Sequence, residues 1–355
     1  MSLSIGIVGL PNVGKSTLFN ALTKNNILMA NYPFATIEPN TGIVPIPDSR
    51  LEKLSEIYNN APIKPATVTF VDIAGLVAGA SKGEGLGNQF LANVRNCQAI
   101  CHVVRAFDDG NVVHVANRVH PKEDIEIINT ELMLADLQTL EKVLPKKQKE
   151  AKANPKIKEE IEELESIKNS LESGKLPNHT KKLSDISSQL LSTKPVIYMF
   201  NISESDLGNK AKKQELSKLV EPSESVFVSA KVEQELQELS EHEAKELLEG
   251  LGQNKSGLVQ LIHAAYKTLG LQSYLTAGDK EVRAWTIKKG STAPQAAGVI
   301  HGDFEKGFIA AEVIDYKNLI KYGSRSEAKS DGKVRTEGKT YVMQPDDVVE
   351  FRFNV

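Results

Sequence analysis

The sequence predicts an α/β protein with a mostly parallel sheet, an inserted antiparallel helical hairpin and a small C-terminal domain rich in strands. Three patterns point to this fold. Short apolar runs alternate with helical patterns in the first part of the chain, heptad-like apolar spacing occupies about 129–190, and short segments separated by glycine follow after about 277. Strands buried on both faces read as continuous apolar runs, and helices between them favour parallel pairing.

The first part of the chain contains the runs expected to form the parallel sheet. Leu18–Leu22 opens the first crossover helix, and Gly257–Leu269 has the pattern of a late one. The runs expected as buried strands are Ile5–Val8, Val68–Asp72, Ile100–Val104, Val196–Phe200 and Val226–Val228.

Two helices with apolar seams are predicted between about 129 and 190. Seams of this kind are typical of helices that pack on each other, and the stretch from Pro145 to Pro155 can hold the turn between them. Two ordinary amphipathic helices packed on the sheet are the alternative. The seam residues recur at spacings of four, three and four, then four, three and seven: Met133, Leu137, Leu140, Leu144 and Ile157, Ile161, Leu164, Leu171.

Lysines concentrate at the predicted tip of this hairpin. Between residues 146 and 158 the acidic residue is Glu150, and the lysines are Lys146, Lys147, Lys149, Lys152, Lys156 and Lys158. A lysine-rich tip predicts contact with the phosphate backbone of RNA through counterion release. Solvated surface charge is the alternative.

The C-terminal part predicts a small sheet-rich domain. Val282–Ile287, Phe308–Val313 and Val348–Phe353 have the pattern of strands, and Ala293–Val299 that of a helix. No nucleophile–base or metal constellation occurs in this stretch, so a partner-binding module is expected. The predicted boundaries are residues 1–128 with 191–276 for the α/β domain, 129–190 for the insertion and 277–355 for the C-terminal domain.

Composition excludes several classes of protein. The 43 basic and 46 acidic side chains leave a net charge of −3, so any contact with nucleic acid must come from a local patch. A hydrophobic content of 40% describes a globular chain, and no apolar run approaches the roughly 20 residues of a membrane span. No signal peptide is recognisable at the start. Cys97 and Cys101 are expected in the core, and the compartment is expected to be the cytoplasm.

A phosphate-binding loop, Gly9-Leu10-Pro11-Asn12-Val13-Gly14-Lys15-Ser16, joins the first predicted strand to the first predicted helix. Glycines let backbone amides close around phosphates, and the helix N-terminus adds partial positive charge. The pattern predicts a P-loop nucleotide hydrolase in which Lys15 reaches the β- and γ-phosphates as a catalytic group and Ser16 ligands Mg²⁺. The candidate nucleotide contacts here are Asn12, Val13, Gly14, Lys15, Ser16 and Thr17.

A second motif, Asp72-Ile73-Ala74-Gly75, ends the second predicted strand. A carboxylate at this place can hold Mg²⁺ through water, and the amide of Gly75 can donate to the γ-phosphate. Asn31–Thr36 is the candidate first switch, in which Thr36 coordinates Mg²⁺; a plain loop threonine is the alternative. The glycine-rich stretch 75–87 is the candidate second switch, because glycine suits a loop that orders only with its ligand.

The expected base-recognition motif departs from that of GTPases. Those proteins carry Asn-Lys-x-Asp after a late strand, and the Asp carboxylate accepts the N1–H and amino protons of guanine. Here the strand leads into Asn201-Ile202-Ser203-Glu204, so Ile202 replaces the lysine and the acid is one methylene longer. The displaced Glu204 removes the guanine clamp, which favours ATP slightly over GTP. Ser229 and Ala230 match the usual base-contacting loop after the last strand.

These motifs together resemble the Obg-like ATPase (YchF) family of P-loop proteins over essentially all 355 residues. The resemblance implies a G-domain-like nucleotide domain, a coiled-coil insertion and a C-terminal TGS domain of the β-grasp type. It also implies slow hydrolysis of ATP, ribosome association and a role in translation or stress responses. Further segments that carry it are Ile37–Asn40, Leu76–Val77, Asn129–Leu132, Arg283–Ile287 and Ala293–His301.

Hydrolysis is expected to be slow. Leu76 stands where many GTPases place the glutamine that orients the attacking water, and leucine cannot do this. The resemblance places the family's catalytic histidine at His114; a surface or packing histidine is the alternative. Asn12 can help to hold a monovalent cation, which the family's neighbours indicate to be potassium, or it can simply shape the loop.

Three functions are compatible with these patterns. The leading hypothesis is a slow, Mg²⁺-dependent ATPase switch that acts on the ribosome as a monomer. A GTPase that uses the same loops is the closest alternative. A nucleotide-gated RNA- or ribosome-binding adaptor with incidental hydrolysis is the third; its RNA contacts would lie in the hairpin tip and the TGS domain.

Overall fold

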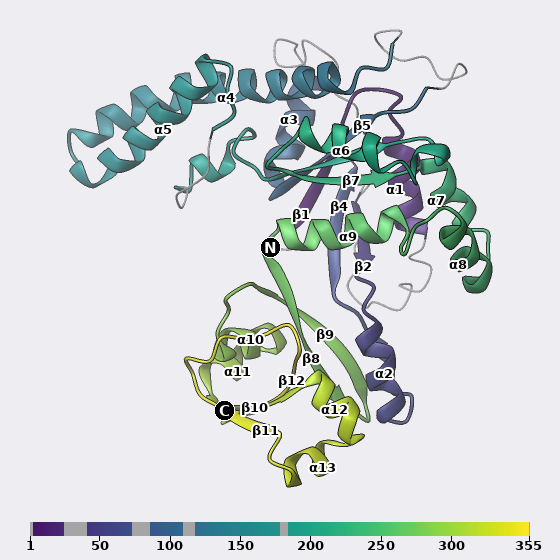
Figure 1. Cartoon of the computed structure of the whole chain (residues 1–355). Helices are drawn as coiled ribbons and strands as arrows, with labels where there is room; N and C mark the ends of the chain where they lie inside the picture. The colour runs from purple at the N-terminus through teal and green to yellow at the C-terminus, as the bar shows by residue number, and fades with distance from the viewer. Residues whose placement is uncertain (1–2, 25–40, 73–85, 109–117, 178–183, 355) are drawn as a thin grey trace. The chain divides into compact units, whose positions relative to one another are not determined.

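The protein is represented by a computed structural model that describes residues 3–24, 41–72, 86–108, 118–177 and 184–354. The chain divides into two compact units. The first consists of residues 1–43 and 69–268, and the second of residues 44–68 and 269–355. Within the described residues, each unit contains a six-stranded sheet (Figure 1).

The sheet of the first unit has the strand order β2-β4-β1-β5-β6-β7. The pairs β1–β4, β1–β5, β5–β6 and β6–β7 are parallel, as the continuous apolar runs predict. All five predicted strands are confirmed, and β2 is an addition. Their bounds are β1 Ser4–Val8, β2 Thr41–Pro45, β4 Thr67–Asp72, β5 Ala99–Arg105, β6 Val196–Asn201 and β7 Glu224–Val228.

The central strand β5 is buried at every position, including Arg105. A parallel strand in this place has neighbours on both edges and helices on the faces, so it excludes water throughout. Cys97 and Cys101 are buried and unpaired, as expected, and burial raises the pKa of the Cys101 thiol to about 12. The helices of this unit, apart from the hairpin, are α1 Lys15–Lys24, α3 Leu86–Asn96, α6 Lys210–Lys218, α7 Ala230–Leu236, α8 Glu241–Gly250 and α9 Gly257–Thr268.

The predicted hairpin consists of α4 (Pro121–Ala151) and α5 (Lys158–Glu172), which lie side by side in Figure 1. Leu140 and Leu144 of α4 pack against Ile161, Leu164 and Leu171 of α5 in one buried cluster. This contact supports the helix-on-helix interpretation. The turn between the two helices is shorter than predicted, because α4 continues through Pro145 to Ala151. A short 3-10 segment, Pro155–Ile157, then precedes α5. A proline removes one helical hydrogen bond, but the packing of Leu140 and Leu144 around it holds the helix together.

Polar side chains fix the root of the hairpin to the sheet unit. Asp136 of α4 is fully buried, and its carboxylate accepts hydrogen bonds from the Leu191 and Ser192 amides and the Ser192 hydroxyl at 2.6–2.9 Å. Arg95, in the last turn of α3, donates to the Thr139 hydroxyl of α4 at 2.8 Å. Lys194 donates to the carbonyl oxygens of Arg95 and Cys97. The end of α3 and the middle of α4 are therefore connected by direct hydrogen bonds.

The second unit contains a sheet with the order β11-β10-β12-β8-β9-β3. The three predicted C-terminal strands correspond to β9, β10 and β12, and the predicted helix to α10. The strands are β3 Ile63–Lys64, β8 Leu271–Gly278, β9 Glu281–Lys288, β10 Phe308–Asp315, β11 Val334–Glu337 and β12 Asp347–Phe353. The helices are α2 Ser49–Ile57, α10 Ala293–Ile300, α11 Gly302–Lys306, α12 Tyr316–Tyr322 and α13 Arg325–Ser330.

Residues 44–68 belong to the second unit through β3 and α2. Ile63 of β3 pairs in parallel with Val282 of β9, and Arg50 of α2 forms an ion pair with Asp346 at 2.9 Å. These units group residues by packing, whereas the domain boundaries proposed above follow sequence patterns, and those boundaries remain a prediction.

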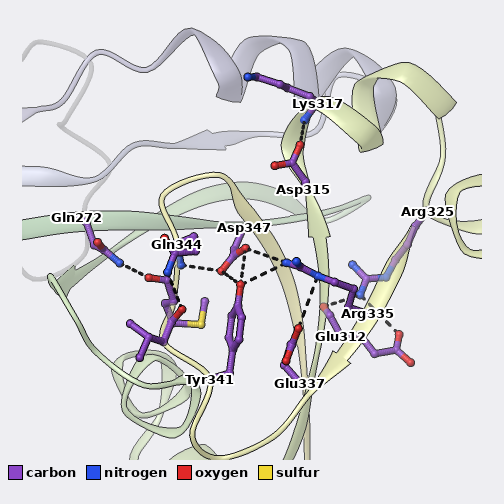
Figure 2. Close-up of polar contacts among 12 residues, drawn as sticks. Gln272, Glu312, Asp315, Lys317, Arg325, Arg335, Glu337, Tyr341, Gln344 and Asp347 are labelled. Carbon is purple, nitrogen blue, oxygen red and sulfur yellow. Dashed lines mark hydrogen bonds and ion pairs between the residues drawn. The ribbon is translucent and has the colours of Figure 1, made fainter. Parts of the chain in front are cut away.

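A polar network closes the loop that leads into β12 (Figure 2). The hydroxyl of Tyr341 donates to Asp347 at 2.9 Å, and the Gln344 amide donates to the same carboxylate at 2.7 Å. Burial, and then the hydrogen bond to Asp347, raises the pKa of Tyr341 to about 12. A second cluster surrounds Glu312 with Arg325 and further cations of the same unit. Because the carboxylates in both clusters have cation or hydrogen-bond partners, the two clusters have a structural explanation.

Candidate nucleotide-binding site

The P-loop lies between β1 and α1, as predicted, and its backbone is shaped by close contacts. Gly14 has a φ of 98°, and a Cβ atom there would lie 2.5 Å from the Asn201 side-chain nitrogen. A Cβ on Gly9 would lie 2.5 Å from the Val103 carbonyl of β5. Asn12 also has positive φ, at 63°. Residues 9 and 14 must therefore be glycine, because only a residue without a Cβ atom lets the loop pass this close to Val103 and Asn201.

Lys15 is buried with its side chain folded along the loop. Its ammonium donates to the Leu10 carbonyl at 2.7 Å, and 8% of the residue is exposed. Burial lowers the pKa of Lys15 to about 8, although the nearby charge of Asp72 acts to raise it. An ammonium desolvated in this way gains strongly from a phosphate, because a neighbouring anion favours the charged form. Ser16 and Thr17 follow in the exposed first turn of α1.

Asp72 lies at the end of β4, where it pairs with Ile7 of β1. Burial raises the pKa of its carboxyl and the charge of Lys15 lowers it. Ser16 and Asp72 supply oxygen donors of the kind that Mg²⁺ prefers, with phosphate and water completing the shell. Within the described ranges no three His, Cys, Asp or Glu side chains gather into a metal-binding group. This chemistry fits a divalent ion held mainly by a nucleotide.

Asn201, the last residue of β6, connects the P-loop to the loop after β7. Its side-chain nitrogen donates to the Val13 carbonyl at 3.0 Å, and its side-chain oxygen accepts from the Ala230 amide at 3.2 Å. The residue is 2% exposed. Ile202 is also buried, and its amide donates to the Val228 carbonyl at 2.9 Å. One buried amide side chain therefore sets the distance between the two loops.

A cavity of about 520 Å³ opens beside this connection. Its volume is within the range of small-ligand sites, which is about 300–1,000 Å³. The predicted residues Asn201, Ile202, Glu204, Ser229 and Ala230 all line it. The remaining lining residues were not predicted: Phe107, Asp108, Ser203, Ser205, Lys231 and Leu251.

The sequence matches known proteins along its whole length. Residues 4–131 match the family described as "50S ribosome-binding GTPase", and residues 271–354 match the YchF GTPase C-terminal family, described as a protein of unknown function. The "Ribosome-binding ATPase YchF" of Bacillus subtilis (strain 168) is 50% identical over 366 residues, covering 100% of both proteins. That of Escherichia coli O157:H7 is 49% identical over 367 residues with the same coverage. The chain belongs to the YchF family.

Solved structures agree with this assignment. The Schizosaccharomyces pombe YchF GTPase is 40% identical, with a TM-score of 0.85 over 99% of this chain and 98% of that one. A GTP binding protein from Pyrococcus horikoshii OT3, 21% identical with a TM-score of 0.61 over 99% and 100% of the two chains, shares the fold. The YchF resemblance and the α/β fold with its helical insertion and C-terminal β domain are thus confirmed.

Several predicted site residues of this YchF-family chain lie outside the described residues. They are Thr36, Gly75 and His114, together with Leu76 and most of the two candidate switches. Their roles remain predictions. Among the described residues, no helix is long and apolar enough to cross a membrane.

Two of the unpredicted lining residues share one positional signal. Phe107 and Asp108 lie two and three residues after the end of β5. Asn201 lies at the carboxyl end of the neighbouring strand β6, so the three residues share one end of the parallel sheet. Ligands of parallel α/β sheets bind outside the carboxyl ends of the strands, so this edge could have been searched systematically. Leu251 directly follows α8, and no spacing rule points to it.

Proposed function

We propose that this chain is a slow, Mg²⁺-dependent ATPase that acts as a nucleotide-controlled switch, binds the ribosome and modulates translation or stress responses. The observation that carries the proposal is the Asn201 connection, which links the P-loop to a loop that lines a cavity of small-ligand size, in a motif without the lysine and aspartate of a guanine clamp. The relatives named ribosome-binding ATPases support the same activity and partner.

Each residue has a role in this proposal. Lys15 neutralises charge on the β- and γ-phosphates, while Ser16, Thr36 and Asp72 hold Mg²⁺ directly or through water. Gly75 senses the γ-phosphate. His114 positions the attacking water, and Asn12 helps to hold a potassium ion. The bound metal supplies neutralisation of the charge that develops on the phosphates.

A GTPase activity is the second candidate, because the S. pombe relative and the matched N-terminal family are both called GTPases. Comparison of ATP and GTP dissociation constants tests this directly. Tight GTP binding with weak ATP binding would replace ATP by GTP in the proposal. Replacing His114 with alanine should lower turnover while the ATP affinity stays, and unchanged turnover would remove His114 from the mechanism. Turnover should also be higher in potassium than in sodium buffer.

The hairpin tip supports ribosome binding through rRNA. Lys147 forms ion pairs with Glu160 at 3.0 Å and Glu150 at 3.9 Å, so its charge is largely compensated. The other lysines of the tip are exposed, and no ion pair joins them to described residues: Lys146, Lys149, Lys152, Lys156 and Lys158. Exposed cations of this kind can replace counterions on a phosphate backbone. The C-terminal unit is the second expected contact.

Ribosome pelleting over a range of salt concentrations tests the tip. Replacing these exposed lysines with glutamine should weaken binding and flatten its salt dependence, by a slope of about 0.7–0.9 for each phosphate that the variant no longer neutralises. The control replaces Lys210 and Lys218, two exposed lysines of α6, and should leave the slope unchanged; it is compared with a tip variant in which only Lys152 and Lys156 are replaced. An unchanged slope in the tip variant would exclude the tip from the interface. We further propose that the protein is a cytoplasmic monomer, which sedimentation analysis can test.

A further inference from the structure

Two charged residues meet at the rim of the cavity beside Asn201. Glu204 begins the short 3-10 segment Glu204–Asp206 after β6, and Lys231 is the second residue of α7. Both line the cavity. The Lys231 ammonium donates to the Glu204 carboxylate at 3.4 Å, so the pair spans from one loop to the other.

Glu204 stands at the sequence position where a guanine clamp carries its aspartate, and its side chain is one methylene longer. Its backbone is fixed, because the buried Ile202 amide donates to Val228 and the Leu207 amide donates to the Glu204 carbonyl at 3.1 Å. The freedom that remains lies in the side chain. A carboxylate in this place can either accept the N1–H and amino protons of guanine or remain paired with Lys231.

The other charges around Glu204 make Lys231 the relevant partner. Lys212, in the first turn of α6, does not line the cavity and is paired with Asp206 at 2.7 Å. Lys231 also reaches Glu235, one turn along α7, at 3.7 Å. The ammonium is therefore shared between a residue of the cavity rim and a residue of its own helix.

We infer that Lys231 is a specificity-determining residue that lowers the affinity for guanine nucleotides by competing with guanine for the Glu204 carboxylate. The inference rests on the proposed nucleotide-binding function. Adenine has an acceptor at ring N1 and gains no hydrogen bond from a carboxylate there, so ATP can bind without breaking the ion pair. Guanine gains the carboxylate only by breaking the pair.

The expected effect is modest because both partners are exposed. The Lys231 side chain is 73% exposed and that of Glu204 43%. Removing the ammonium should raise GTP affinity about two- to fivefold, which corresponds to about 0.4–1 kcal/mol and lies within the range of exposed ion pairs. The ratio of GTP to ATP affinity is the quantity to follow, because a lost positive charge also weakens binding of any triphosphate.

The test measures dissociation constants for ATP and GTP by calorimetry on the full chain with Mg²⁺. Lys231→Met removes the ammonium and keeps the apolar stem, and it should raise the GTP-to-ATP affinity ratio two- to fivefold. Glu204→Gln introduced into the Lys231→Met protein should abolish the gain. Glu235→Gln releases Lys231 from its second partner and should leave the ratio equal or lower. Lys245→Met makes the same charge change on α8, at a residue that does not line the cavity, and should not alter the ratio.

Two results would overturn the inference. One is an unchanged ratio in Lys231→Met, and the other is a gain that persists when Glu204 is replaced as well. If the wild-type chain bound neither nucleotide, the proposed function itself would fail. The two failures are therefore distinguishable. Melting temperatures of the exposed-site variants should match that of the wild type, which verifies that each protein is folded.

Discussion

Replacing Asn201 with alanine should separate the P-loop from the base-binding loop. The substitution removes the hydrogen bond to the Val13 carbonyl at 3.0 Å and the one from the Ala230 amide at 3.2 Å. A buried group left without its partner costs about 1–3 kcal/mol, and Ala230 can reach water through the adjacent cavity. The expected loss of unfolding free energy is therefore about 1–3 kcal/mol, mainly from the Val13 carbonyl. ATP affinity should fall at least about tenfold, which is a further 1.4 kcal/mol.

Urea unfolding and calorimetry on the same preparations measure both effects. Asn201→Asp keeps an acceptor for Ala230 but turns a carboxylate oxygen toward the Val13 carbonyl, so it should be no better than alanine. The control is Asn209→Ala, which removes the cap of α6 where the side chain accepts from the Lys212 amide at 3.1 Å. It should cost about 1 kcal/mol and leave ATP affinity unchanged. Wild-type ATP affinity in Asn201→Ala would show that this connection does not position the site.

Three further predictions concern the P-loop and the root of the hairpin. Gly14→Ala should abolish ATP binding measured by calorimetry, because its Cβ would lie 2.5 Å from the Asn201 side-chain nitrogen; retained affinity would show that the loop can shift. ATP affinity should be highest below pH 8 and decline above it, because the free-state pKa of Lys15 is about 8. Bound phosphate raises the pKa of Lys15, so calorimetry in buffers of different ionisation enthalpy should detect proton uptake on ATP binding at about pH 8.5. The absence of proton uptake would contradict the assignment of Lys15 as a phosphate ligand. Asp136→Ala should lower the unfolding free energy in urea by about 3–5 kcal/mol, because two buried amides lose their acceptor, and Asp136→Asn should recover part of this loss.

The elements that could be predicted from the sequence are those with a local signal. Strand β5 was predictable because a strand buried on both faces is apolar at nearly every position. The two residues of β3 carry no such pattern, and their pairing with β9 joins residues more than 200 positions apart. Pro145 predicted a turn by its chemistry, but the helix continues because tertiary packing around it is stronger than the local preference.

The candidate site divides in the same way. The P-loop and Asp72 follow from spacing and strand context, because bound phosphate dictates which residue types stand where. Phe107, Lys231 and Leu251 line the cavity from three separate parts of the chain, and the sequence patterns assigned none of them to the site. The ion pair between Lys231 of α7 and Glu204 of the 3-10 segment joins residues 27 positions apart, so it is found only once the fold is known.

The hydrogen bond from Arg95 to Thr139 holds α4 at a point far from its C-terminal end. Twelve helical residues separate Thr139 from the end of α4 at Ala151, which is about 18 Å at the rise of an α-helix. If α4 rotated by about 10° around Thr139, its far end would move by about 3 Å, the length of one hydrogen bond. The place of the far end of α4, where the lysines lie, therefore depends on the contacts that hold Thr139 at the root.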